Sequence, residues 1–295
     1  DIETGKLTEV TDRNSKRISP SEATFSNLSN KIWLVTDKDN EFQRLAAMNL
    51  NTKKTTYYTS DIPWNVESFN LSEDKKSIVF ITNEGGLNKM YLMNTGTKAY
   101  KEIKNLPIGL ISGARFTKDN QTIFFNQSTA QSASDVYQLN IKTAKIERWT
   151  ESELGEMQPS DMSVPKFIEW KSFDDLKISG FYYPASPKFK GKRPVIIMIH
   201  GGPEGQSMAS FLDSNNFYTS EMGVSLVYPN VRGSSGFGKT YLEKDNGFLR
   251  EDSVKDIGAL LDWIAKQPEV DKDKIMIMGR SYGGYMTLAN AFHYA

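Results

Sequence analysis

Met276-Ile277-Met278-Gly279-Arg280-Ser281-Tyr282-Gly283-Gly284-Tyr285-Met286 is the stretch that decides the fold of the second half of this 295-residue chain. An apolar run leads directly into the pattern G-x-S-x-G, and a helix-forming stretch follows. This order displays a serine at a sharp turn, where small residues two positions before and after it let the strand and the helix pack closely. Ser281 is therefore the candidate nucleophile, and Gly279 and Gly283 fill the two small positions.

The turn around Ser281 also predicts half of an oxyanion hole. The N–H of Tyr282 would point at the carbonyl oxygen under attack, and a helix beginning near Gly284 adds the positive end of its dipole. A second apolar run, Pro194 to Ile199, leads into His200-Gly201-Gly202-Pro203, a loop of the type that supplies the other oxyanion donor in lipases and esterases. Each motif alone could be an ordinary turn after a strand. Together, in this order, they predict an α/β-hydrolase domain.

Three motifs carry a resemblance to a known family. They are His200-Gly201-Gly202-Pro203, Asn230-Val231-Arg232-Gly233-Ser234-Ser235-Gly236-Phe237-Gly238 and Gly279-Arg280-Ser281-Tyr282-Gly283-Gly284-Tyr285. In this order they resemble the prolyl oligopeptidase family of serine peptidases, most of all its dipeptidyl-peptidase and acylaminoacyl-peptidase branches. The resemblance implies an N-terminal β-propeller followed by an α/β-hydrolase domain.

The same resemblance implies a reaction and the residues that perform it. Ser281 would form an acyl-enzyme with a short peptide, while the amides of Gly202 and Tyr282 hold the oxyanion. The side chain of Tyr282 would also bind substrate, as a wall of the pocket for the residue before the scissile bond. These roles are what membership of the family implies for this chain.

The general base that Ser281 needs has no clear candidate in the sequence. In the family the Asp and His of the triad follow the nucleophile, whereas this sequence stops at Ala295. His200 belongs to the predicted oxyanion loop, and His293 lies three helical turns past Ser281, about 18 Å away at 1.5 Å per residue. We therefore expect a hydrolase domain that is incomplete relative to the family, with impaired peptidase activity.

The first half of the chain repeats itself with a period near 45 residues. Leu71 to Phe80 lines up with Phe116 to Phe125 at an offset of 45, and Leu28 to Trp33 is a weaker copy. Short alternating strands at this period predict propeller blades of four strands each, with a β-sandwich as the alternative. About three blades fit into residues 1–150, and Asp1 to Lys6 resembles the closing hairpin of another. The chain is thus expected to be truncated at both ends relative to the family.

Composition marks a linker between the two halves. Residues 151–165 carry Gly155, Pro159 and Pro165 among scattered acids, which is typical of a linker. Residues 166–295 then form the predicted hydrolase domain.

Two elements of this domain can be predicted in more detail. Lys166 to Tyr183 alternates as two strands around the turn Phe173-Asp174-Asp175. Ser253 to Gln267 is the clearest helix, with Ser253 and Asp256 as a capping box and Pro268 as its end. Its position between two strands predicts a parallel crossover.

Composition also bears on partners. Thirty-six basic and thirty-six acidic residues cancel, so no net charge directs the chain to nucleic acid or anionic membranes. No apolar run approaches the length of a transmembrane helix, and the sequence contains no cysteine for disulfides or thiolate metal sites. We expect a peptide substrate and no cofactor, metal, nucleic acid or membrane. The apolar strand before Ser281 could pair with other chains, and the location, cytoplasmic or periplasmic, stays open.

Three other functions stay open. Gly233 to Thr240 satisfies the P-loop pattern G-x-x-x-x-G-K-[ST]. However, Pro229 and Asn230 interrupt the strand before it, and Asp245-Asn246-Gly247 ends any helix after about one turn. Nucleotide binding is therefore the least favoured of the three. An esterase acting on small acyl esters would need a less powerful site, because esters are cleaved more easily than amides. A non-catalytic binding module, in which the blades present loops to a partner, would account for the lack of a base.

Overall fold

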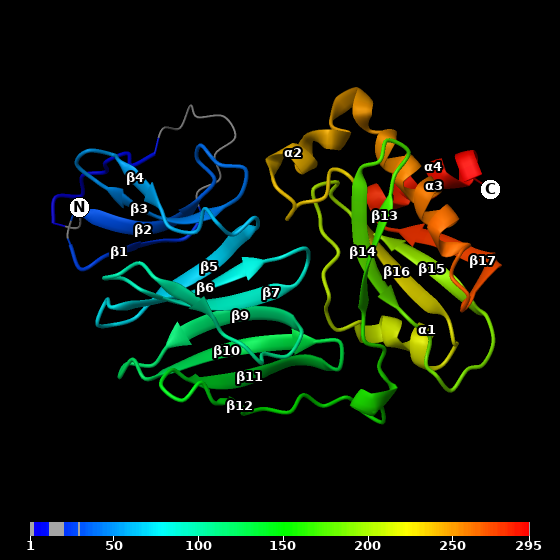
Figure 1. Ribbon diagram of the computed structural model, residues 1–295, viewed down its shortest axis with the longest axis horizontal. Coiled ribbons are helices and arrows are strands. Elements are labelled where there is room, and N and C mark those ends of the chain that lie inside the picture. Colours follow the sequence, from blue (N-terminus) through cyan, green and yellow to red (C-terminus); the bar gives the residue numbers. More distant parts are fainter. Residues whose placement is uncertain (1–2, 12–20, 29, 295) are drawn as a thin grey trace.

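The computed structural model describes residues 3–11, 21–28 and 30–294, and every structural statement below concerns these residues. Three four-stranded sheets lie on one side of the molecule, and a five-stranded sheet with helices lies on the other (Figure 1). The predicted hairpin at the start of the chain falls partly outside the described residues. So does Ser29, within the weakest of the three repeats.

Each of the three small sheets is an antiparallel meander in which consecutive strands pair. Their strands, sheet by sheet, are β1 (Ala23–Phe25), β2 (Lys31–Thr36), β3 (Arg44–Asn49) and β4 (Thr55–Tyr57); β5 (Asn65–Leu71), β6 (Ser77–Asn83), β7 (Asn88–Asn94) and β8 (Tyr100–Glu102); and β9 (Gly109–Phe116), β10 (Thr122–Thr129), β11 (Ser132–Asn140) and β12 (Ile146–Arg148). Each repeat in the sequence therefore corresponds to one sheet.

The small sheets pack face to face because their strands alternate with a period of two. In β6, Ile78 and Phe80 pack in the core shared with the first sheet, whereas Val79 and Ile81 pack in the core shared with the third. The middle sheet is thus buried on both faces. This explains why β6 is an almost continuous apolar run rather than an alternating one.

The larger sheet has the strand order β13-β14-β16-β15-β17. Its strands are β13 (Lys166–Lys171), β14 (Lys177–Tyr183), β15 (Arg193–Ile199), β16 (Ser225–Asn230) and β17 (Val270–Gly279). The predicted hairpin β13–β14 is antiparallel, and β15 pairs in parallel with both β16 and β17. β17, which leads to Ser281, forms one edge of the sheet as described.

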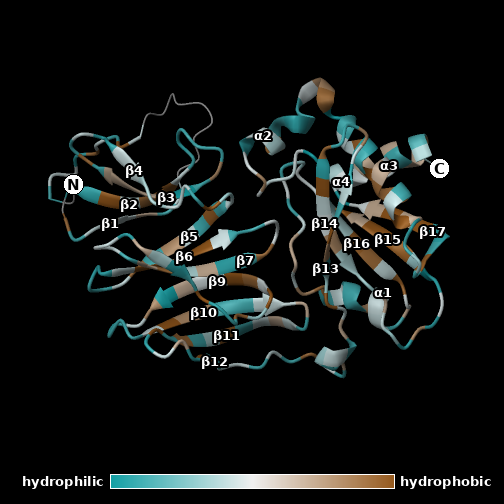
Figure 2. Cartoon of the chain, viewed as in Figure 1, coloured by the Kyte–Doolittle hydropathy of each residue, from teal (hydrophilic) through white to brown (hydrophobic). Residues whose placement is uncertain are grey.

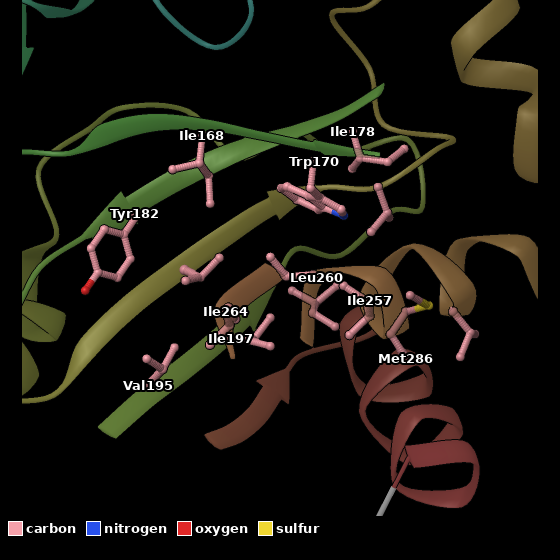
Figure 3. Packing of buried hydrophobic residues seen from close by; sticks show 14 of the residues in the cluster. Ile168, Trp170, Ile178, Tyr182, Val195, Ile197, Ile257, Leu260, Ile264 and Met286 are labelled. Atoms are coloured by element: carbon pink, nitrogen blue, oxygen red, sulfur yellow. The ribbon is translucent and has the colours of Figure 1, made fainter. Parts of the chain in front are cut away.

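Helices cover the larger sheet. They are α1 (Asn216–Ser220), α2 (Lys239–Leu242), α3 (Asp252–Ile264) and α4 (Tyr282–Tyr294), with short 3-10 turns at Pro159–Asp161, Asp213–Asn215, Glu243–Asp245 and Gly247–Leu249. The apolar faces of α3 and α4 pack on the sheet through residues such as Ile257, Leu260 and Met286 (Figure 3). The parallel strand β15 is the most apolar strand of this half, and polar residues lie on the outer turns (Figure 2). Among the described residues, no helix is long and apolar enough to cross a membrane.

The predicted capping box of α3 is wrong. The helix begins at Asp252 and ends at Ile264, and no side chain caps its first residue. The hydroxyl of Ser253 instead donates to the carbonyl of Arg250 at 2.7 Å, and the carboxylate of Asp256 accepts hydrogen bonds from Arg232. Both side chains are buried, and neither bonds to an amide of the first helical turn: Asp256 binds Arg232, and Ser253 contacts the hydroxyl of Tyr282 besides the carbonyl of Arg250.

Candidate active site

Ser281 lies in the two-residue turn between the end of β17 and the start of α4. Its φ is 59°, in the left-handed region that costs a non-glycine residue roughly 1–3 kcal/mol. Its carbonyl accepts the N–H of Gly284 at 2.9 Å and of Tyr285 at 3.2 Å, which starts the helix. The side chain is exposed. The turn is therefore strained and presents the hydroxyl outward, the arrangement of a nucleophile elbow.

Gly279 and Gly283 let this turn pack against the end of β15. A Cβ on Gly279 would lie 2.6 Å from the carbonyl oxygen of Ile199, and a Cβ on Gly283 would lie 2.2 Å from the same oxygen. Any larger residue at either position would push the two strands and the helix apart. The two small positions are thus required by the tertiary contact that brings the loop after β15 to the serine.

That loop, His200-Gly201-Gly202-Pro203, lies directly beside the serine. A Cβ built on Gly201 would lie 3.5 Å from Cβ and 3.9 Å from Oγ of Ser281. Gly202 has a φ of 134° and precedes a cis peptide bond to Pro203. The N–H of Tyr282 belongs to the first turn of α4, where helix amides have no carbonyl of their own helix to bind. The structure thus brings the loop and the elbow together, while the roles of Gly202 and Tyr282 as oxyanion donors stay predictions.

Neither histidine contacts Ser281 among the interactions of the described residues. In His200, Nδ1 lies 2.8 Å from the carbonyl oxygen of Gly201 and Nε2 lies 2.9 Å from Oγ of Ser234. Burial lowers the pKa of His200, so its ring is neutral at pH 7. His293 is exposed near the far end of α4, with Nε2 3.7 Å from a carboxylate oxygen of Glu251.

The side chain of Tyr282 is held against the loop before α3. Its hydroxyl lies 2.7 Å from Oγ of Ser253 and donates to Oδ2 of Asp245 at 3.2 Å. Burial raises the pKa of Tyr282 to about 12 and also raises the pKa of Asp245, which forms an ion pair with Arg250. Sequence reasoning missed Asp245 and Arg250, because nothing in their spacing distinguishes them from other loop charges. Contact between Tyr282 and substrate stays a prediction.

A cavity of about 520 Å³ opens beside the elbow. Residues of β15, β17 and the segment 206–215 line it together with Tyr183 of β14 and Tyr228 of β16, and its apolar side chains include Met198, Ile199, Met208, Phe211, Leu212 and Met278. Arg280, which precedes Ser281 in the turn, and Gly201, which packs against the serine, belong to the same lining. Its volume lies within the range of small-ligand sites, so it can hold one or two side chains of a peptide.

The segment that matches the P-loop pattern is bonded to the first small sheet. Nζ of Lys239 donates to the carbonyl oxygen of Asp37 at 2.7 Å, and Oγ1 of Thr240 donates to Oε2 of Glu41 at 3.0 Å. The helix that follows, α2, has only four residues. Because the lysine and the threonine already have protein partners, this geometry favours a structural role over phosphate binding.

Comparison with known proteins identifies the family. Residues 210–294 match the profile of the Prolyl oligopeptidase family. The matched part of the chain belongs to the prolyl oligopeptidase family. Over 100 residues, the chain is also 35% identical to acylamino-acid-releasing enzyme 1 of Oryza sativa subsp. japonica, a match that covers 34% of this chain and 13% of that protein. The family predicted from the three motifs is thus confirmed, and its members are serine peptidases.

The likeness to prolyl oligopeptidase relatives extends over most of the chain. Dipeptidyl-peptidase 5 of Porphyromonas gingivalis is 24% identical over 271 residues, which are 89% of this chain and 39% of that protein. A crystal structure of puromycin hydrolase superposes with a TM-score of 0.81 at 17% identity, over 92% of this chain and 42% of that chain. The chain therefore has the fold of propeller and hydrolase peptidases and spans about two fifths of the length of these two proteins.

Proposed function

We propose that the protein is a serine peptidase that cleaves short peptides through an acyl-enzyme on Ser281. The observation that supports this most is the exposed serine at a φ of 59°, with Gly201 packed against it. Oγ attacks the peptide carbonyl carbon, and the amides of Gly202 and Tyr282 donate to the oxygen that becomes negative. The amine then leaves with a proton, and water hydrolyses the ester that remains.

Attack also requires a group that accepts the proton of Ser281. The two histidines are engaged elsewhere, His200 with Ser234 and His293 near Glu251. We therefore expect the 295-residue chain to hydrolyse peptides slowly. Oxyanion donors and substrate binding alone still support a rate above that of water, as in triad variants of other serine peptidases.

We also propose a domain organisation that follows the relatives. The three small sheets are blades of a propeller over residues 1–150, residues 151–165 are a linker, and residues 166–295 are the first part of an α/β-hydrolase domain. Supporting this, each small sheet is a four-stranded meander. We further propose that β17 can pair with another chain, because it is an edge strand on which Met276 is 54% exposed.

A fluorophosphonate probe with peptide mapping by mass spectrometry tests the proposed nucleophile. We expect one phosphonyl group on Ser281 in the natural chain and no such product at this position in Ser281→Ala. The matched control is Ser214→Ala, which removes an exposed serine of the same half and should leave labelling unchanged. If Ser281 reacts no faster than Ser214 does in the natural chain, the elbow does not activate its serine and the proposal fails. Dipeptide amides and the corresponding esters then separate peptidase from esterase activity.

A further inference from the structure

The glycine-rich segment Gly233 to Thr240 has no part in the proposed chemistry, yet it contacts both halves of the molecule. One end bonds to the turn between β2 and β3, in the first small sheet. The other end packs against the loop that carries the proposed oxyanion donor. The two sets of contacts form one continuous connection.

At the first end, the carboxylate of Glu41 binds the start of α2. Oε1 accepts the N–H of Thr240 at 2.7 Å, and Oε2 accepts its hydroxyl at 3.0 Å. The N–H of Lys239 donates to the backbone oxygen of Glu41 at 3.2 Å, and its Nζ lies 3.4 Å from a carboxylate oxygen of Asp37. Gly238 makes this approach possible, because its φ is 91° and a Cβ there would lie 2.5 Å from Oε1 of Glu41.

At the second end, the segment supports the loop from His200 to Gln206. The N–H of Ser235 donates to the carbonyl oxygen of Gly205 at 2.9 Å. One residue earlier in the segment, Oγ of Ser234 lies 2.9 Å from Nε2 of His200. The loop holds three glycines and so has little conformational preference of its own. Its position must therefore come from neighbours such as these.

A parallel contact joins the same loop to the second small sheet. Nδ2 of Asn83 donates to Oε1 of Gln206 at 2.7 Å, and the N–H of Ala209 donates to the carbonyl oxygen of Gly86 at 3.0 Å. Gln206 also packs on Gly236, where a Cβ would lie 2.4 Å from its amide nitrogen. The oxyanion loop is thus held between the small sheets and the glycine-rich segment.

We infer that the segment Gly233 to Thr240 connects the β2–β3 turn to the oxyanion loop, so that Glu41 and Lys239 are positioning residues for the proposed hydrolysis. The catalytic consequence rests on the proposed function. An oxyanion donor has to sit within about 0.5 Å of its working position, so a small shift of the loop reduces the rate without removing any reacting group. Contacts in the small sheets therefore influence the reaction from outside the hydrolase half.

Two readouts on Glu41→Ala test this inference. We expect hydrogen exchange of the amides from Gly201 to Gln206 to become about tenfold faster and phosphonylation of Ser281 about tenfold slower. Glu41→Ala removes both hydrogen bonds to Thr240, and loss of charge-assisted bonds corresponds to at least about one factor of ten. Glu41→Gln keeps one acceptor oxygen for Thr240 and should restore most of both. The matched control is Glu221→Ala, which breaks the 3.1 Å ion pair with Lys188 inside the hydrolase half and should change neither.

Gly238→Ala provides a second variant that leaves every charge in place. Its added Cβ displaces Glu41 and should reproduce both effects of Glu41→Ala. Unchanged exchange of residues 201–206 in both variants overturns the inference, whether or not Ser281 reacts with the probe. An equal rise of exchange over the whole chain also overturns it, because a purely structural role acts everywhere. If Ser281 does not react in the natural chain, the proposed function fails and the exchange result alone decides the positioning role.

Discussion

Asp135 in the third small sheet and Asp256 in α3 are both carboxylates that solvent does not reach, but their partners lie at different distances along the chain. The N–H of Ser152 and the hydroxyl of Thr150 bind Asp135 from within 17 residues. Asp256 is bound by Arg232, 24 residues away, and by Ser172, 84 residues away. A small sheet thus satisfies its buried charge locally, whereas the larger sheet depends on the assembly of distant segments.

The pKa values of the two carboxyl groups shift in opposite directions. Burial alone would raise the pKa of Asp135, but hydrogen bonds from Ser132, Thr150 and Arg148 hold it below its ordinary value. Burial raises the pKa of Asp256 in spite of its bonds to Arg232 and Ser172, because this residue lies on the buried face of α3. The direction of each pKa shift is therefore set by the balance between burial, which raises the pKa, and the hydrogen bonds that the carboxylate accepts, which lower it.

Asp256→Ala should have the largest effect of any single change in this comparison. It leaves the guanidinium of Arg232, which is 4% exposed, with the half-exposed Asp174 and with Asp252, 4.0 Å away, as its remaining charged partners. Breaking a buried pair in this way should lower the free energy of unfolding by about 3–5 kcal/mol. Urea unfolding followed by circular dichroism measures it. Asp273→Ala, which removes an exposed partner of Lys272, is the control, and a loss below about 1 kcal/mol for Asp256→Ala would contradict the reasoning.

Asp135→Ala should cost less, about 1–3 kcal/mol. Its charged partner Arg148 is 37% exposed, so water can solvate the guanidinium once the carboxylate is gone. Because all of these partners lie in the third small sheet or within four residues of its last strand, hydrogen exchange should increase there and stay unchanged in β15 and β17. Increased exchange in the larger sheet would show that the two halves do not respond separately.

The smallest expected effect is on the pH dependence of stability. An unfolded Asp titrates near pH 4. The lowered pKa of Asp135 contributes stability to the fold above that pH, and this contribution is lost as the pH falls through the folded pKa. Asp135→Asn should therefore flatten the decline of the free energy of unfolding below pH 4. The raised pKa of Asp256 acts in the opposite sense, because the folded state retains its proton as pH rises above 4.

Removing the carboxyl group in Asp256→Asn should therefore make stability rise more steeply, or fall less, between pH 4 and the folded pKa. Urea unfolding at one-unit pH intervals from 3 to 7 compares the two variants with the natural chain. Slopes that change in the same direction in both variants would show that the two carboxyl groups are not tuned oppositely.

Local patterns predicted much of this molecule. The period near 45 marks the small sheets, the alternation around Phe173 to Asp175 marks the hairpin β13–β14, and the run before Ser281 marks a strand that ends in a sharp turn. These features depend on residues close together in the chain. Their periodicity is therefore visible without knowing what they contact.

The sequence interpretation failed for the predicted capping box, where the side chain of Asp256 could bind either an amide of its own helix or a distant residue. Ser253 and Asp256 match a capping box, yet the structure bonds them to Arg250, Tyr282 and Arg232. Burial decides this, because a carboxylate inside the core gains more from a guanidinium than from one helix amide. The spacing of residues in the sequence does not indicate whether the carboxylate will bind the guanidinium or the helix amide.

By itself, the sequence determined the repeats, the elbow with its small residues and the family motifs, because backbone geometry at strands and tight turns restricts which residues can stand there. Only the tertiary structure decided how the glycine-rich segment is used. Lys239 and Thr240 satisfy a phosphate-binding pattern, but packing of the two halves places Asp37 and Glu41 within hydrogen-bond distance of them. Polar side chains bind the groups that the folded chain places next to them, and for Thr240 that group is Glu41, almost 200 residues away in the sequence.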